Sequence, residues 1–364
     1  MTDPQTLPAA PPLVEPISLG AGRLQFSRRP AIIRLVMTRA FQLPVLLLCL
    51  TGLAAAETPS HVVLVRDTAA VTGWQVDSNA AHAMVVAGMK QLTGQTSEAA
   101  AWQQIVSSTD VVGIKVSTLA APLHVTHQAV LDAIATGLRQ AGVPAINIIV
   151  FDREAQKLAA AEYRATGFRI EDVISGAGWD ADATIENSAV GKLIWGDFDF
   201  GKPEPLSTLS HLPKLVTRTI TKLINVPVLM DHDAAGLAGC LYNISLGMAD
   251  NTRRFEQFSQ RGDAPIAELA GLPAVRTKLV LNICDAFVAG YAGGPAFKPQ
   301  YSWPHGGLYF SRDPVAIDTM CLELLEAKRQ ENQLPPIGAR ASHVLTAARY
   351  GLGQTNATLV EVTR

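Results

Sequence analysis

Short apolar runs alternate with helix-like segments along the chain, and this order constrains the fold more than any other feature of the sequence. Strand-like apolar runs occupy 61–65, 110–116 and 145–151, and helix-like stretches occupy about 77–94, 97–107, 127–140 and 154–166. A continuous apolar run is typical of a strand that is covered on both faces. The order strand, helix, helix, strand, helix, strand, helix predicts an α/β sheet that is mostly parallel, with crossover helices.

The second half continues the pattern less regularly. Residues 175–213 are irregular, and the later features are an apolar run at 222–230, a strand at 277–284, a loop at 291–305, and helices at about 313–330 and 341–350. Pro227 lies inside the run at 222–230, and a proline favours a sheet edge or a bulge because it has no amide hydrogen. No repeat or interdomain linker follows residue 57, so we expect one large α/β domain over 57–364 with a mixed, mostly parallel sheet.

The first 56 residues have the layout of an export signal. Arg28-Arg29 and Arg39 precede a short apolar run from Leu43, and Ala54-Ala55-Ala56 ends it, which predicts cleavage after Ala56. The apolar run is shorter than the roughly 20 residues that a membrane-spanning helix needs. The arginine pair suits the twin-arginine route, whereas a start at Met37 would give a complete Sec signal, and the sequence leaves both open. We therefore expect a periplasmic protein that meets the membrane only during export.

Composition excludes several classes of protein. The 364 residues carry 30 basic and 32 acidic side chains, 48% are hydrophobic and 17% are charged. Such a chain is too apolar to be disordered and lacks the basic excess of a nucleic-acid binder. Residues 57–364 retain 25 basic and 30 acidic side chains once the five arginines and two acids of 1–56 are removed.

Cysteines give little support for a cluster or a disulfide framework. Cys49 lies in the predicted signal, so Cys240, Cys284 and Cys321 remain. Three is an odd number, so at least one thiol should stay unpaired even in an oxidising compartment. No C-x-x-C motif occurs, and we expect neither an iron–sulfur cluster nor a cysteine-based zinc site.

The densest polar group is Asp231-His232-Asp233, which follows an apolar strand. Ligands in open α/β sheets bind beyond the carboxyl ends of the strands. A histidine between two carboxylates can move a proton, and the same three side chains could hold a divalent metal. Alternatively, Asp233 caps the next turn and His232 is structural.

Other strand ends carry further candidates. Lys115 ends the strand at 110–116 and could neutralise a carboxylate or phosphate, or be a solvated charge. Asp152 follows the strand at 145–151 as a metal ligand or as the cap of the next helix. Asp285 follows the strand at 277–284 and is a candidate of the same kind, and the Gly293-Gly294 loop allows a close approach of backbone to a ligand.

Three stretches together resemble the DUF362 family, a domain of unknown function found in bacteria and archaea. They are Asp110-Val-Val-Gly-Ile-Lys115, the stretch from Asn225 through Asp231-His232 to Tyr242-Asn243, and Asp285-Ala-Phe with Gly293-Gly294-Pro295 and 311–318. The resemblance covers nearly all of 60–355, and it implies an α/β fold and, for some members, export by the twin-arginine route. Many members read Lys-Asn where this chain reads Tyr242-Asn243.

A remoter resemblance connects the order of elements and His232 to the nickel-pincer lactate racemases. In those enzymes a histidine takes part in acid–base catalysis, and a lysine ten residues later anchors the cofactor. His232 matches the histidine, but Tyr242 stands at the lysine position. The cofactor therefore stays unknown, a divalent metal being one candidate, and Tyr242 is a candidate acid or ligand.

The sequence leads to two hypotheses. In the first, an exported enzyme acts on a small anionic substrate, with His232, Lys115 and Tyr242 as catalytic residues and Asn243, Gly293, Gly294 and Asp285 binding the ligand. The metal, if present, would lie among Asp231, His232, Asp233 and Asp152. In the second, the chain is a non-catalytic periplasmic protein that binds or carries a metal or a small ligand. The sequence alone does not decide whether the protein is an enzyme.

Overall fold

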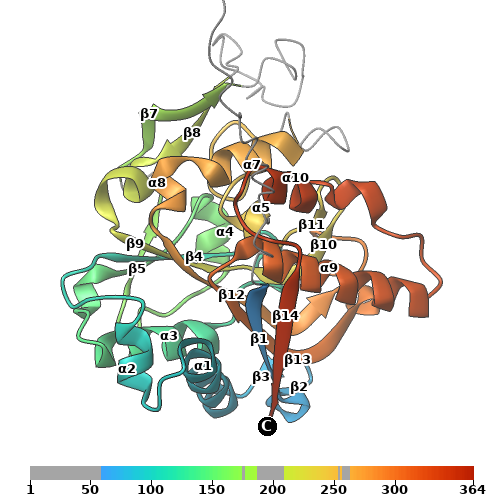
Figure 1. Ribbon diagram of the computed structural model, residues 1–364, viewed down its shortest axis with the longest axis horizontal. Coiled ribbons are helices and arrows are strands. Elements are labelled where there is room, and N and C mark those ends of the chain that lie inside the picture. The colour runs from blue at the N-terminus through green and yellow to red at the C-terminus, as the bar shows by residue number, and fades with distance from the viewer. Residues whose placement is uncertain (1–58, 174–176, 187–208, 253–254, 256–262) are drawn as a thin grey trace, which may run out of the picture. The chain divides into compact units, whose positions relative to one another are not determined.

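The computed structural model describes residues 59–173, 177–186, 209–252, 255 and 263–364, all of which belong to one compact unit, Ala56–Arg364 (Figure 1). The predicted signal at 1–56 lies outside these residues. The strands are β1 Ser60–Arg66, β2 Val71–Thr72, β3 Gln75–Val76, β4 Val112–Val116, β5 Ile148–Asp152, β6 Arg169–Asp172, β7 Trp179–Glu186, β8 Leu209–Pro213, β9 Lys222–Val226, β10 Val228–His232, β11 Gly236–Leu237, β12 Leu279–Gly290, β13 Ser302–Ser311 and β14 Ala357–Thr363. The α-helices are α1 Ser78–Thr93, α2 Glu98–Gln103, α3 Gln128–Gln140, α4 Ala155–Ala160, α5 Cys240–Asn243, α7 Asp263–Gly271, α8 Pro273–Arg276, α9 Pro314–Glu331 and α10 His343–Arg349.

One mixed sheet organises the described residues. Its strand order is β14-β1-β13-β12-β9-β4-β5-β6, with β10 pairing with the far part of β12 and β11 pairing with β10. The pairs from β12 through β9, β4 and β5 to β6 are parallel, whereas β13 is antiparallel to both β12 and β1. This arrangement confirms the expected α/β fold with a mostly parallel sheet.

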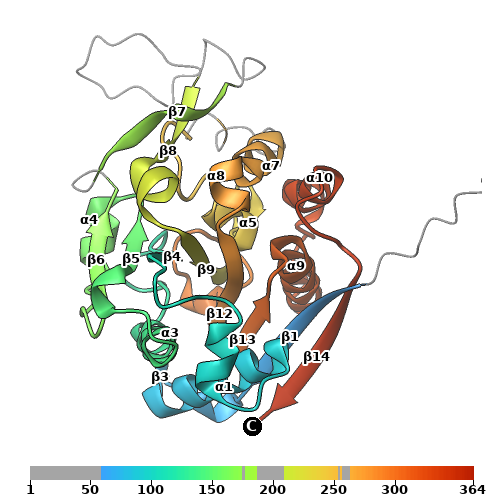
Figure 2. The ribbon, with the colours of Figure 1, turned by 60° about the vertical axis from the view of Figure 1, so that its left-hand side comes forward.

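Helices cover both faces of the sheet (Figures 1 and 2). Helices α1, α2 and α3 pack on one face, where Val112, Ile114 and Val116 of β4 point into their apolar cluster. Helices α5, α7, α9 and α10 pack on the other face around Leu223, Leu229 and their neighbours. Because side chains alternate along a strand, burial on both faces explains the continuous apolar runs in the sequence.

The helix ends follow the local signals in the sequence. Asp77 caps α1 by accepting a hydrogen bond from the amide of Ala80 at 2.7 Å, and Gly94 ends this helix with a φ of +70°. Asp313 accepts hydrogen bonds from the amides of Val315 and Ala316, and Pro314 takes the first position of α9. Aspartate caps, an initial proline and a terminal glycine are the features that predicted these two helices.

Several predicted elements differ from the structure. The apolar run at 222–230 is two strands, because Pro227 interrupts it and the chain passes from pairing β4 to pairing the far part of β12. The predicted loop at 291–305 ends earlier than expected, because β13 begins at Ser302. The helix predicted at about 154–166 is also shorter, since α4 ends at Ala160. The strands β6, β13 and β14 were not predicted, and β7 and β8 lie within 175–213, which was expected to be irregular.

A close helix contact yields a test of the packing. A Cβ at Gly137 of α3 would collide with the indole nitrogen of the fully buried Trp102. Replacing Gly137 with alanine should therefore lower the free energy of unfolding by about 1–3 kcal/mol, the usual cost of overpacking a core, as measured by urea unfolding. Gly271→Ala is the matched control, because a Cβ there meets Leu352 only at 3.5 Å and its stability should change little. Equal stabilities of the two variants would contradict the close packing of α2 on α3.

No helix within the described ranges combines the length and the apolar character needed to cross a membrane.

Candidate functional site

A narrow cleft opens at the carboxyl ends of β4 and β5, under helix α5. Its volume is about 350 Å³ including the solvent at its mouth. The lining residues are Lys115, Ser117, Thr118, Leu119, Asp152, Arg153, Glu154, Lys157, Ala238, Tyr242, Asn243 and Gly247. The cleft therefore lies where parallel α/β sheets commonly bind ligands.

Lys115 forms the floor of the cleft. Its side chain is 1% exposed, and its ammonium donates to Asp152 Oδ1 at 2.8 Å, to Asn243 Oδ1 at 3.0 Å and to the carbonyl of Val116 at 2.7 Å. An ammonium has three hydrogens, so these three acceptors satisfy it fully. Burial lowers the pKa of Lys115, and the charge of Asp152 opposes this effect. The amine is thus easier to deprotonate than an ordinary lysine.

Asp152 is the counter-ion and is held from several sides. Its Oδ2 accepts from the amide of Thr118 at 2.8 Å and from the Thr118 hydroxyl at 2.6 Å, and its Oδ1 also accepts from the amide of Arg153 at 2.6 Å. These donors come from the segments that directly follow β4 and β5. The loops at the two strand ends therefore fix the carboxylate against Lys115.

A row of polar side chains extends from Lys115 across the sheet. Lys115, Asn225, Asn282 and Ser311 are consecutive partners on β4, β9, β12 and β13, so they share one face. Asn243 of α5 donates to Asn225 Oδ1 at 2.8 Å, and Asn225 donates to Asn282 Oδ1 at 2.9 Å. These three asparagines are buried. The row therefore ties α5 to the sheet through amides that satisfy one another.

Charged side chains stand at the mouth of the cleft. Arg153 donates through one nitrogen to the carbonyls of Leu246 and Ala249 and through the other to Glu154. Lys157 lies 3.2 Å from the same Glu154 carboxylate and is partly exposed. Three cationic and two anionic side chains line the cleft, which gives it a net positive charge.

Tyr242 links the cleft to His232. Its ring lies 4.8 Å from the imidazole of His232, measured between centroids, although His232 does not line the cleft. His232 Nδ1 accepts from the amides of Ala234 and Ala235 at 3.2 Å each. The structure thus brings together the two residues that the sequence separates by ten positions.

Asp231 and Asp233, the neighbours of His232, form hydrogen bonds with the Gly293-Gly294 loop. Asp231 Oδ1 accepts from the amide of Gly294 at 2.9 Å, and the Arg329 guanidinium lies 3.8 Å from its other oxygen. Burial raises the pKa of Asp231. Asp233 is exposed, and its amide donates to the Gly294 carbonyl at 3.2 Å. The Gly293-Gly294 loop is therefore docked on the end of β10 and is not among the residues that line the cleft.

Asp285 belongs to a separate pair. It is fully buried and accepts from both the amide and Nδ1 of His127, at 2.8 Å each, at the start of α3. The pKa of His127 is raised overall. Burial is the largest single influence and lowers this pKa, but the charge of Asp285 and its hydrogen bond to His127 together raise it by more. Its neighbours Ile283 and Phe287 lie in the cluster under α1–α3, on the opposite face from Lys115. Asp285 thus does not join the ligand-binding group that the sequence suggested.

The four candidate metal ligands do not converge. Asp152 is bound to Lys115 and Thr118, Asp231 to Gly294, and His232 Nδ1 to backbone amides. Among the residues that the structure describes, no group of three or more His, Cys, Asp and Glu side chains is arranged to hold a metal.

Sequence reasoning missed several residues of the site. Thr118, Arg153, Glu154 and Lys157 follow the two strand ends directly, so their proximity to Lys115 and Asp152 was a usable signal. Asn225 and Asn282 are polar residues inside otherwise apolar strands. A buried amide requires partners, so two such asparagines on separate strands could have indicated a network.

Comparisons with known proteins place the chain in a family. The model of a family described as a domain of unknown function, DUF362, matches residues 112–323. The crystal structure of a protein from Thermotoga maritima, a structural genomics target, is similar with a TM-score of 0.36 and 11% identity, over 72% of this chain and 61% of that one. The chain thus spans less than two thirds of that protein. No protein of curated function matches. The matched residues run from the start of β4 through the cleft to α9, and the chain belongs to the DUF362 family.

Proposed function

We propose that this chain is an exported enzyme that binds a small anionic substrate in the cleft and transfers a proton through Lys115 and Asp152. The observation that carries the proposal is the fully buried Lys115, whose ammonium lies at the floor of a cleft and whose pKa is lowered. A buried ionisable side chain that has a shifted pKa and a charged partner and lies in a cleft is characteristic of functional sites. Tyr242 also lines the cleft, and its ring contacts the imidazole of His232, with 4.8 Å between the ring centroids.

The substrate class follows from size and charge. The cleft has a volume of about 350 Å³ including the solvent at its mouth, and Arg153 and Lys157 supply cationic charge there. A carboxylate head group with a small α-substituent meets these conditions. The resemblance to lactate racemases makes 2-hydroxy acids the first substrates to examine.

A pincer cofactor attached through lysine does not fit this chain, because Tyr242 occupies the position of the anchoring lysine. A divalent metal stays a candidate cofactor, and the proton transfer proposed here does not depend on it.

A second candidate function is ligand binding without turnover. All three hydrogens of the Lys115 ammonium already have protein acceptors, which favours a fixed charge over a reactive amine. In that case the protein is a periplasmic carrier of small anions. Exchange of the ligand's α-hydrogen for solvent deuterium, followed by proton NMR, separates the two functions: exchange supports the enzyme, and tight binding without exchange supports the carrier.

Lys157 provides a test of the anionic ligand. We expect Lys157→Ala to weaken binding of 2-hydroxy acids about 3–5-fold, because an exposed charge near a ligand is worth up to about 1 kcal/mol. Calorimetric titration with lactate measures the loss. Lys328→Ala is a matched control, since Lys328 is also partly exposed and pairs with a glutamate three residues away. If both variants lost the same affinity, or if neither lost any, the result would argue against a cationic charge at the mouth of the cleft.

The mass of the mature protein tests the proposed export. The signal layout at 1–56 leads us to propose a periplasmic mature protein that begins at Glu57. Intact mass of protein purified from the periplasm should match residues 57–364. A mass that includes residue 37 or earlier residues would contradict the predicted cleavage.

A further inference from the structure

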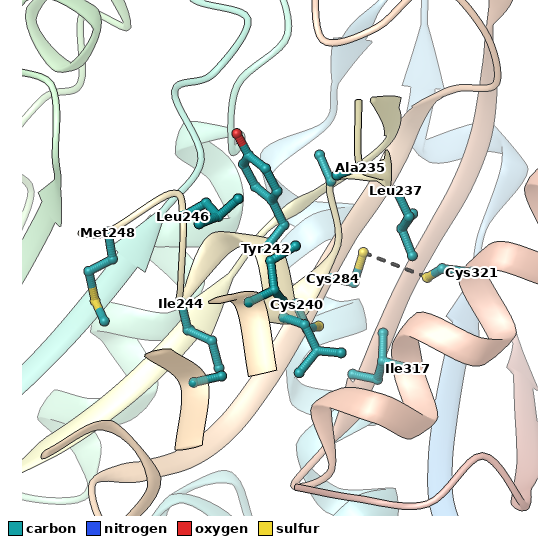
Figure 3. Packing of buried hydrophobic residues seen from close by; sticks show 14 of the residues in the cluster. Ala235, Leu237, Cys240, Tyr242, Ile244, Leu246, Met248, Cys284, Ile317 and Cys321 are labelled. Atoms are coloured by element: carbon teal, nitrogen blue, oxygen red, sulfur yellow. Dashed lines mark hydrogen bonds between the residues drawn. The ribbon is translucent and has the colours of Figure 1, made fainter. Parts of the chain in front are cut away.

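Two buried thiols face each other between β12 and α9. Cys321 of α9 donates to the sulfur of Cys284 of β12 at 3.9 Å, and both residues are fully buried (Figure 3). Cys240, at the start of α5, is also fully buried, and its backbone amide donates to the Asp318 carboxylate at 2.6 Å. A sulfur–sulfur contact therefore joins Cys284 and Cys321, whereas Cys240 is bound to Asp318 through its amide.

We infer that Cys284 and Cys321 form a disulfide when the chain folds in an oxidising environment, and that Cys240 stays a free thiol. A disulfide needs sulfurs about 2.05 Å apart, so the pair must close by about 2 Å. The bond would join two cysteines that lie 37 residues apart in sequence, one on the long strand β12 and one on the helix α9. It also accounts for the odd number of cysteines without an intermolecular bond.

The chemistry requires a disulfide as oxidant. The thiolate of one cysteine attacks a small-molecule disulfide such as oxidised glutathione and releases one glutathione thiol. The second cysteine then attacks the mixed disulfide and releases the other glutathione, so that two protein thiols are oxidised and one glutathione disulfide is reduced.

The bond must form before folding is complete. Both thiols lack exposed surface in the folded chain, and their pKa values are raised, for Cys284 by the contact with Cys321 and by burial. A buried thiol with a raised pKa is unreactive. Oxidation therefore precedes the docking of α9 on the sheet, and the folded protein then shields the bond from reductants.

The position of the pair relates it to the cleft. Asp318, one turn before Cys321 on α9, accepts hydrogen bonds from the amides of Cys240 and Leu241 at 2.6 and 2.9 Å. These amides begin α5, which carries Tyr242 and Asn243. A bond between Cys284 and Cys321 would thus fix α9, and through it α5, to β12.

Oxidative refolding tests the inference without reference to export or activity. The full-length chain is denatured, reduced and refolded with and without oxidised glutathione, then alkylated and mapped by peptide mass spectrometry, which also separates Cys49. We expect a Cys284–Cys321 bond, an alkylated Cys240 and a melting temperature about 5–10 °C higher than that of the reduced protein. Alkylation of all three thiols after oxidative refolding, or a bond that includes Cys240, would overturn the inference.

Two variants keep the test decisive. Cys240→Ala should retain both the bond and the rise in melting temperature, whereas Cys321→Ala should lose both and leave Cys284 alkylated. If Cys321→Ala fails to fold, Cys240→Ala still decides, because absence of the bond in that variant contradicts the assigned pair. Rapid oxidation of protein that is already folded would overturn the proposed order of bond formation and burial.

Discussion

Replacing Lys115 with methionine is expected to lower the free energy of unfolding by about 3–5 kcal/mol and to abolish binding of the anionic ligand. The reason is that the buried Asp152 carboxylate would lose the ammonium with which it forms an ion pair at 2.8 Å. The remaining donors to Asp152, from Thr118 and the amide of Arg153, are dipoles and do not neutralise the charge. Asn243 would also lose a partner, which loosens α5. Urea unfolding and calorimetric titration measure the two effects.

Two further variants separate lost charge balance from lost packing. Lys115→Met combined with Asp152→Leu should recover much of the stability, because neither charge is then left unpaired, but should not recover binding. Lys278→Met is the control: Lys278 donates to the carbonyls of Val216 and Thr217, so its loss should cost only about 1–2 kcal/mol. If Lys115→Met proved no less stable than Lys278→Met, the ion pair would not be the element that holds the cleft together.

The contribution of the buried Asp318 to stability should fall as the pH rises from about 4 to about 7. Burial raises the pKa of this carboxyl to about 7, against the lowering effect of the amides of Leu241 and Cys240. In the unfolded chain an aspartate ionises near pH 4, so unfolding releases a proton throughout this interval and rising pH favours it. The difference between a pKa near 4 in the unfolded chain and about 7 in the folded chain corresponds to a loss of up to about 4 kcal/mol, and the contribution of Asp318 becomes constant above pH 7.

Asp318→Asn isolates this contribution. The amide does not ionise, so the difference in stability between wild type and variant should change across the interval and stay constant above it. The variant should also be less stable near pH 4–5, since one of the two backbone amides at the start of α5 would meet an NH₂ group in place of an oxygen. Parallel curves of unfolding free energy against pH for the two proteins would show that Asp318 does not titrate in this range.

The sequence predicted most of the central sheet and its helices, because the strands are continuous apolar runs and the helices carry strong caps. It did not predict β13, which opens with Ser-Trp-Pro-His-Gly-Gly and has no continuous apolar run to mark it. It also joined β9 and β10, because Pro227 was taken as a bulge within one strand. The separation depends on pairing with β12, which comes from a distant part of the chain.

The candidate site could be predicted in part. Lys115 and Asp152 were found because strand ends gather ligand-binding side chains in a parallel sheet. Asp285 was assigned to the same group and lies on the other face, since Asn282 shares the face of Lys115 and Asp285 is three positions further along β12. A position at the end of a strand predicts the edge of the sheet on which a residue lies. The face on which its side chain lies depends on the strand register, which only the structure shows.

The polar row on β4, β9, β12 and β13 also bears on how the chain reaches its fold. Parallel strands rich in valine, isoleucine and leucine can slide past one another at little cost, because each register buries similar apolar surface. A slip of one residue between β9 and its neighbours would send Asn225 to the opposite face, among the apolar side chains under α1–α3, and would break its hydrogen bonds with Asn243 and Asn282. The asparagines thus favour the native strand register, because a slip that breaks their hydrogen bonds costs free energy and the native alignment satisfies them all.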